Sequence, residues 1–234
     1  MKILMLTPYL PYPLYSGGQI RTYNLLKNLA KHHEITLFSF IRSEDERKHI
    51  KELNKFCRRV EVFQRRPAWS VVNILLAGFS WYPFLVSIYY SWKLKRAMAQ
   101  ELSDHHYDLI HSETFYVMPN IPQTTVPILL VEQTIEFLVY QHFVKKVPFI
   151  LRPLLLFDVA KIKYWEKFYW EKSQKVIAMS KPDSTVMQKE IPGLEVAIVP
   201  NGVDMEMFSN IAVRKHTRKR VLFVGNFKWL QNRE

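Results

Sequence analysis

Residues 1–21, MKILMLTPYLPYPLYSGGQIR, combine a short apolar strand, a loop rich in Pro and Tyr, and the start of an amphipathic helix. Residues 2–6 form the expected strand, the loop ends in Gly17-Gly18, and the helix begins near Gln19. Free backbone N–H groups and the positive end of the helix dipole converge at such a junction, and glycine allows close approach of a phosphate or sugar. Gly-Gly is also a common turn, so the segment by itself is explained by plain loop geometry, with an anion site as the alternative.

Short apolar runs alternate with amphipathic segments along most of the chain. The expected strands are residues 3–6, 34–40, 59–63, 108–111, 128–132, 176–179 and 196–199. The expected helices are residues 20–31, 43–57, two between 71 and 103 with a break near 83, 153–173 and 181–190. A capping box of Ser43 with Glu46 indicates the start of the second helix. This alternation predicts an α/β fold, a Rossmann-like parallel sheet with helices on both faces.

Polar side chains follow several of these strands at their carboxyl ends, where ligands bind in such sheets. His111 ends one strand, with Ser112 and Glu113 after it. Glu132 ends the next, with Gln133 and Thr134 after it, and Ser180 follows the strand at 176–179. Each has a structural alternative, because His111 also fits a hydrogen-bonded core histidine and Glu132 a solvent-facing carboxylate. Ser180 is better explained as the cap of the helix at 181–190 than as a nucleophile.

Composition limits the classes of function. The single Cys57 excludes an internal disulfide framework, indicates a reducing cytoplasm, and is best interpreted as a buried, inert thiol. The formal net charge is +12, which is typical of proteins with anionic partners. The Lys and Arg residues are spread out, and the densest run, residues 214–220, is expected to be a solvated linker. Since no recognition motif accompanies the charge, we expect no nucleic-acid partner.

Residues 67–92 form a stretch without charged side chains and with many aromatic residues. It is long enough to span a bilayer, but Asn73, Gly78 and Pro83 interrupt it. Three alternatives remain open: two short buried helices, an element that lies on a membrane surface, and a true span. Its Trp and Tyr residues suit an interface in which rings are partly hydrated.

The C-terminal part contains the turn VPNGVD at 199–204, a basic linker, and a further strand at 220–224 that ends in Gly225-Asn226. We expect an N-terminal Rossmann-like domain over residues 1–200, an interdomain linker over 201–219, and the truncated start of a second domain over 220–234.

Four segments together resemble the family 4 glycosyltransferases of the GT-B class: PYPLYSGGQIR, YDLIH, AMSKPD, and VPNGVDMEMF followed by VLFVGNFKWLQNRE. The last segment is similar to a bacterial subgroup associated with exopolysaccharide or cell-surface glycan assembly. The resemblance implies the N-terminal, acceptor-side half of a two-domain GT-B fold. It also implies transfer from a nucleotide-diphosphate sugar to a glycan or lipid-linked acceptor, with retained anomeric configuration and with neither metal nor cofactor.

The resemblance also assigns residues. His111 would contact the transferred sugar as the catalytic residue, and Glu132 and Arg21 would lie on the acceptor side. The donor would be held by Gly17 and Gly18 and, in the second domain, by Gly225, Asn226 and Lys228. Many relatives carry Arg at the position of Asn226, where it contacts the donor phosphate, so this chain departs from the family pattern there.

The resemblance leaves two alternatives, which are a sugar-nucleotide epimerase on the same fold and a non-catalytic membrane-associated binding module. The PNGVD turn argues against the epimerase. A cytoplasmic enzyme that docks on the inner face of the plasma membrane, with an anionic membrane surface as partner, would combine the transferase with the membrane alternative. Because most of the donor site would lie beyond residue 234, we expect residues 1–234 alone to transfer little or no sugar.

Overall fold

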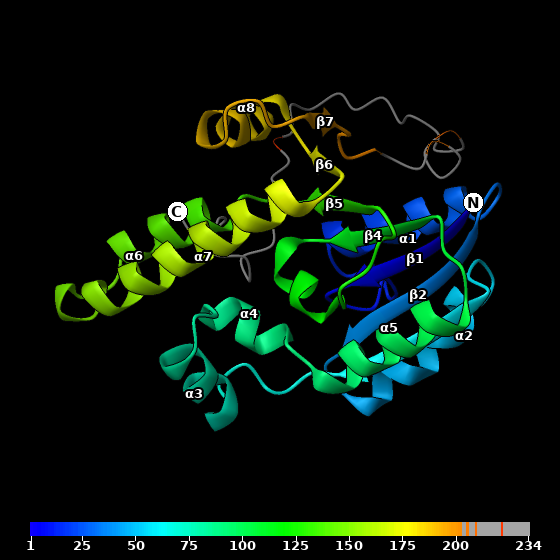
Figure 1. Cartoon of the computed structure of the whole chain (residues 1–234), viewed down its shortest axis with the longest axis horizontal. Helices are drawn as coiled ribbons and strands as arrows, with labels where there is room; N and C mark the ends of the chain where they lie inside the picture. The colour runs from blue at the N-terminus through cyan, green and yellow to red at the C-terminus, as the bar shows by residue number, and fades with distance from the viewer. Residues whose placement is uncertain (203–204, 206–208, 210–220, 222–234) are drawn as a thin grey trace.

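Seven strands form one parallel sheet in the described part of the computed structural model, which comprises residues 1–202, 205, 209 and 221 (Figure 1). The spatial order is β3-β2-β1-β4-β5-β6-β7. The strands are β1 (Lys2–Thr7), β2 (Glu34–Ile41), β3 (Arg59–Gln64), β4 (Leu109–Glu113), β5 (Ile128–Glu132), β6 (Lys175–Ala178) and β7 (Val196–Ile198). The predicted α/β fold with a parallel sheet is confirmed, and β4 continues to Glu113 beyond its predicted end.

Helices cover both faces of the sheet (Figure 1). The helices are α1 (Gly17–Leu29), η1 (Glu44–His49), α2 (Ile50–Leu53), α3 (Val71–Phe79), α4 (Phe84–Tyr89), α5 (Trp92–Asp104), η2 (Phe115–Asn120), α6 (Glu136–Lys145), η3 (Phe149–Leu151), α7 (Arg152–Lys172) and α8 (Lys181–Glu190). Successive residues of β1 face opposite ways. Met5 packs in one hydrophobic cluster with α1 and α2, whereas Leu4 and Leu6 pack in another with α4, α5, η2 and α7.

The predicted helix over residues 43–57 is wrong in detail. The structure has the 3-10 helix η1 followed by the one-turn helix α2. Ser43 makes no side-chain cap, and the Glu46 carboxylate accepts from the backbone N–H of Arg42, so the capping box does not form. Residues 44–49 carry no apolar side chain to bury, which leaves nothing to hold a full α-helical turn against the sheet.

Residues 71–103 form three helices rather than the predicted two, and α6 lies in a stretch for which the sequence predicts no element. For residues 67–92, one alternative was two short buried helices. This is confirmed for α4, where Leu85 and Val86 are buried, but is wrong for α3, whose apolar side chains are largely exposed. Phe79 of α3 is 89% exposed. No helix within residues 1–202 combines the length and apolar character needed to cross a membrane.

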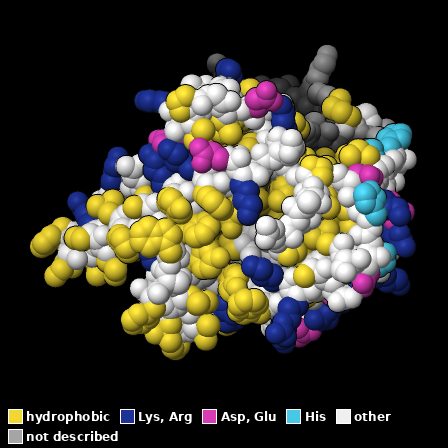
Figure 2. All heavy atoms as spheres, in the orientation of Figure 1, with side chains coloured by type: hydrophobic (Ala, Val, Ile, Leu, Met, Phe, Trp, Pro, Cys, Tyr) yellow, Lys and Arg dark blue, Asp and Glu magenta, His cyan; other side chains and the backbone are white. Residues whose placement is uncertain are grey.

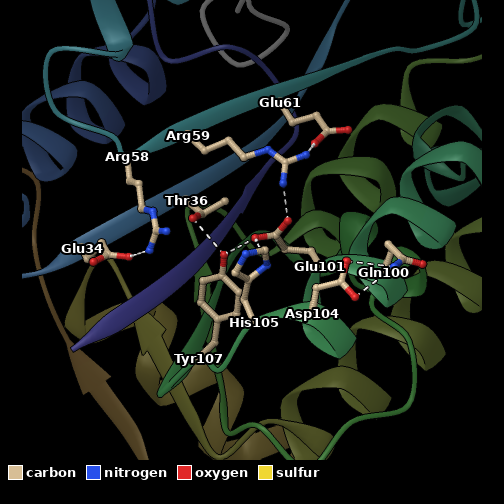
Figure 3. Close-up of polar contacts among 10 residues, drawn as sticks. All are labelled: Glu34, Thr36, Arg58, Arg59, Glu61, Gln100, Glu101, Asp104, His105 and Tyr107. Carbon is tan, nitrogen blue, oxygen red and sulfur yellow. Dashed lines mark hydrogen bonds and ion pairs between the residues drawn. The ribbon is translucent and has the colours of Figure 1, made fainter.

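A polar cluster joins the amino-terminal ends of β2, β3 and β4 to α5 (Figure 3). The buried Glu101 carboxylate accepts hydrogen bonds from Arg59 and from the Tyr107 hydroxyl. The Tyr107 oxygen in turn accepts from the Thr36 hydroxyl, 2.9 Å away. Burial, followed by the hydrogen bond to Glu101, raises the pKa of Tyr107 to about 12. The polar groups of this cluster satisfy one another's hydrogen-bonding needs, so it stabilises the amino-terminal ends of these strands. A ligand is therefore expected at the opposite, carboxyl ends of the strands.

Candidate functional site

The site begins with two side chains that project from the carboxyl end of β4. His111 and Glu113 are two residues apart, so they lie on the same face of the sheet. His111 is paired in register with Met5, and the cluster that contains Met5 places this face under α1. The exposed fractions of His111 and Glu113 are 4% and 0%. The sequence therefore places an imidazole and a carboxylate together beneath a helix at the ligand-binding edge.

Hydrogen bonds link these two side chains to residues from other loops. His111 Nε2 lies 3.0 Å from Glu113 Oε1, and the Gln133 amide donates to Glu113 Oε2 at 2.9 Å. The Tyr9 hydroxyl donates to Gln133 Oε1 at 3.0 Å. The four residues form one chain of bonds, Tyr9 to Gln133 to Glu113 and His111 to Glu113, which we call the edge network.

Glu113 is the acidic member of the edge network. Burial alone would raise the pKa of Glu113, but the hydrogen bond and charge of His111, the Gln133 amide and the charge of Arg21 outweigh burial and lower it. An ionised carboxylate only accepts, so Nε2 of His111 must carry the proton in their hydrogen bond. Glu113 thereby fixes both the ring orientation and the protonated nitrogen of His111.

The first turn of α1 packs directly on the edge network. Ser16 caps this helix by accepting from the backbone N–H of Gln19 at 3.3 Å. A Cβ atom added to Gly18 would lie 2.0 Å from the Tyr9 hydroxyl and 2.7 Å from Gln133 Oε1, whereas one added to Gly17 would meet nothing within 4 Å. A side chain at position 18 would therefore have to displace Tyr9 and Gln133, whereas glycine lets the positive end of the α1 dipole approach the edge network.

Arg21 lies one turn further along α1 and connects the site to the C-terminal segment. Its Nη1 donates to the Pro200 carbonyl at 3.2 Å and to Asn201 Oδ1 at 3.4 Å, while its Nε is buried without a partner. A hollow of about 440 Å³ lies between α1 and residues 199–202 beside Arg21. His111, Glu113 and Gln133 do not line this hollow.

Glu132 does not join the edge network, although it ends the neighbouring strand. Val131 is in register with Glu113, so Glu132 is one residue further and faces the opposite side of the sheet. It is 2% exposed and its Oε1 accepts from the Trp170 indole of α7 at 3.1 Å. Burial and the nearby charge of Glu166 raise its pKa well above the usual value. The acceptor-side role of Glu132 stays a prediction, separate from the edge network.

Of the predicted site residues, His111, Gly17, Gly18 and Arg21 lie together at the carboxyl ends of the strands. Glu132 lies on the other face of the sheet, beneath α7. Gly225, Asn226 and Lys228, predicted for the donor, lie outside the described residues. Ser180 caps α8, as predicted, by accepting from the backbone N–H of Asp183. Among the described residues, no group of three His, Cys, Asp or Glu side chains is placed to hold a metal ion.

The site roles predicted from the resemblance do not include Glu113, Gln133 or Tyr9. Glu113 and Gln133 follow two of the predicted strands, where polar groups able to bind a sugar or phosphate are expected, whereas Tyr9 is not a candidate. Glu113 could have been found from its two-residue spacing to His111, had the strand been extended to it. Tyr9 and Gln133 are 124 residues apart, and no local pattern in the sequence indicates that they contact each other.

Comparison with known sequences identifies the family of the chain. The model for Glycosyltransferase Family 4 matches residues 15–207, which include α1, the edge network except Tyr9, and the PNG turn. The chain belongs to glycosyltransferase family 4. The predicted resemblance is confirmed at this level. No curated protein matches the chain significantly. Membership of glycosyltransferase family 4 implies a nucleotide-sugar donor and a glycan acceptor in general terms.

Proposed function

We propose that this glycosyltransferase moves a sugar from a nucleotide-diphosphate sugar to a glycan or lipid-linked acceptor, with retention of anomeric configuration and without a metal. The observation that supports the proposal most strongly is the edge network beneath the start of α1. It sets a fixed imidazole beside a helix N-terminus at the carboxyl edge of a parallel sheet, where ligands bind. Assembly of an exopolysaccharide or cell-surface glycan in the cytoplasm is the proposed setting.

The chemistry follows from where charge develops. Cleavage of the glycosidic bond leaves negative charge on the departing nucleotide diphosphate, which the backbone N–H groups of the first turn of α1 would stabilise. The transferred sugar gains oxocarbenium character, and His111 would hold it in place while the acceptor hydroxyl approaches. Glu113 acts through His111 and does not itself touch the sugar. Gly225, Asn226 and Lys228 complete the donor half of the proposal.

The proposal is tested with the longest open reading frame that contains these 234 residues. Release of nucleotide diphosphate is measured against a panel of UDP-, GDP- and other nucleotide sugars, with and without glycan acceptors. We expect His111→Ala to lower kcat at least about a hundredfold, the scale of losing one preorganised polar contact in a transition state. The matched control is His106→Ala, because the His106 side chain is 82% exposed at the opposite edge of the sheet.

Two results would contradict the proposal. One is the absence of any nucleotide-sugar turnover by the complete reading frame. The other is equal activity of the His111→Ala and His106→Ala proteins, both shown to be folded by circular dichroism. The product's anomeric configuration, read by NMR, tests retention separately.

A further inference from the structure

Two apolar protrusions extend from the same side of the molecule, away from the sheet (Figure 1). One is α3, where Trp69 before the helix is 80% exposed and Phe79 at its end is 89% exposed. The other is the tip of the hairpin formed by α6 and α7. Here Phe149 is 80%, Ile150 is 75% and Leu154 is 70% exposed. Figure 2 shows hydrophobic side chains gathered over both regions. We call α3 and this hairpin tip together the apolar prongs.

The apolar prongs are held in fixed positions relative to each other. Trp81, which follows α3, contacts the Phe157 ring of α7 with centroids 6.4 Å apart, and its carbonyl accepts from the Trp165 indole at 2.8 Å. Lys161 of α7 donates to the carbonyls of Ala77 and Ser80 at 2.7 and 3.0 Å. These bonds make one surface out of segments far apart in the sequence.

The charged residues that flank the apolar prongs most closely in the sequence are basic. No acidic residue lies between Glu61 and Glu101, a stretch with five Lys and Arg residues, and none lies between Glu136 and Asp158. The second stretch carries Lys145, Lys146 and Arg152 directly beside the exposed tip. Exposed aromatic and aliphatic side chains bordered by cations are typical of surfaces that enter the headgroup region of an anionic bilayer.

We propose that the apolar prongs dock this protein on a lipid bilayer that contains anionic headgroups. A second copy of the chain is a poorer occupant, because each copy carries a formal net charge of +12 and the borders of both surfaces would be basic. A bilayer supplies the opposite charge and accepts protruding side chains without a complementary shape. Because α6 starts four residues after the end of β5, the hairpin leads from the edge that carries the edge network to the membrane. The docking proposal does not depend on sugar transfer.

The test is co-sedimentation of the chain with vesicles of phosphatidylcholine alone and of an equimolar mixture of phosphatidylcholine and phosphatidylglycerol. We expect binding to the mixed vesicles that weakens as salt is added, and little binding to phosphatidylcholine alone. Combined Phe79→Ser, Phe149→Ser and Ile150→Ser should weaken binding to the mixed vesicles at least about tenfold, because three apolar side chains no longer leave water. Lys145→Glu with Lys146→Glu should weaken it about tenfold or more and reduce its salt dependence.

The matched control is Ile198→Ser with Val199→Ser, which removes two exposed apolar side chains, each 41% exposed, at the end of β7 and outside the apolar prongs. It should bind like the unmodified chain. Circular dichroism establishes that each variant is folded. The proposal fails if the unmodified chain does not bind mixed vesicles, or if the triple serine variant binds as well as the control. A dimer in sedimentation velocity that the triple variant abolishes, without vesicle binding, would assign the surface to a second copy instead.

Discussion

Gly17 and Gly18 differ in their surroundings, although both lie in the first turn of α1. A methyl group at position 18 would overlap the Tyr9 hydroxyl and Gln133 Oε1, and the hydrogen bond between them would have to break. We expect Gly18→Ala to lower the free energy of unfolding by about 1–3 kcal/mol, the scale of overpacking with a lost buried hydrogen bond. Urea denaturation measures the change.

Gly17→Ala is the matched control for Gly18→Ala, because its added methyl group meets nothing within 4 Å. Since Ala favours the helical conformation over Gly, its free energy of unfolding should be unchanged or up to about 1 kcal/mol higher. Equal destabilisation by the two substitutions would mean that helix geometry, rather than contact with Tyr9 and Gln133, requires glycine.

Glu136 is expected to contribute to the pH dependence of stability. Burial raises the pKa of Glu136 from 4.5 to about 7. The folded state therefore binds this proton more tightly than the unfolded state, and the free energy of unfolding falls as pH rises from about 4.5 through about 7. The loss from this group should be about 2 kcal/mol, after allowance for its partial exposure.

Denaturation between pH 5 and pH 8 tests this assignment in the unmodified chain, Glu136→Gln and Glu44→Gln. Glu136→Gln should show a weaker fall in stability across the range, because its amide does not titrate. Glu44 is a surface carboxyl whose pKa is lowered by its hydrogen bond to Arg47, so Glu44→Gln should keep the steeper fall. An unchanged slope in Glu136→Gln would place the titration elsewhere, with the buried Glu132 and Glu166 pair as the next groups to test, since their pKa values are also raised.

At the scale of elements, α7 supplies the caps of three other helices. The Glu166 carboxylate accepts from the backbone N–H groups of Glu136 and Phe137 at the start of α6, at 2.9 and 3.1 Å. Asp158 accepts from the backbone N–H of Phe84 at the start of α4, and Lys161 donates to carbonyls at the end of α3. Each side chain supplies what the free backbone groups of the helix end need, an acceptor at the two N-termini and a donor at the C-terminus.

Lys161 is the cap whose loss is easiest to isolate. Its ammonium group is buried, and Lys161→Met keeps the length of the side chain while leaving the carbonyls of Ala77 and Ser80 without this donor. We expect the free energy of unfolding to fall by about 1–3 kcal/mol. Limited proteolysis should also cut residues 71–82 faster, because α3 would open more often.

Lys163→Met is the control for Lys161→Met. Lys163 lies two residues away on α7 and pairs with Glu190 at 2.7 Å, in a partly exposed ion pair worth at most about 1 kcal/mol. If both substitutions accelerate cleavage of residues 71–82 equally, α7 as a whole rather than the Lys161 cap holds α3.

These caps explain which elements could be predicted from sequence. The strands and α8 carry their own signals, which are short apolar runs for the strands, and the local Ser180 cap and the Pro in the first turn for α8. In contrast, the start of α6 is capped by a residue 30 positions away, and no local pattern marks it. The candidate site also combines residues with and without a local sequence signal. His111 and Gly18 lie in recognisable motifs, whereas the contact of Gln133 and Tyr9 with them depends on the sheet topology.

At the scale of the whole molecule, two apolar layers share a single sheet. Cys57 is buried in the layer with α1 and α2, as predicted for an inert thiol, whereas Trp170 lies at the centre of the layer with α7. Leu4 and Met5 are neighbours in β1, yet each belongs to a different layer. Because every strand between β3 and β7 is hydrogen-bonded to the next, neither layer should persist once the other is lost.

Cys57 and the tryptophans therefore report on the same event from opposite faces of the sheet. Burial raises the pKa of the Cys57 thiol to about 12, so at pH 8 its reaction with a disulfide reagent should be on the order of a thousandfold slower than that of a free thiol. Added urea should accelerate labelling with the same dependence that tryptophan fluorescence gives for unfolding. Labelling of Cys57 at urea concentrations that leave the fluorescence unchanged would mean that the layer with α1 opens by itself, which would separate the start of α1 from the edge network without unfolding the α7 side.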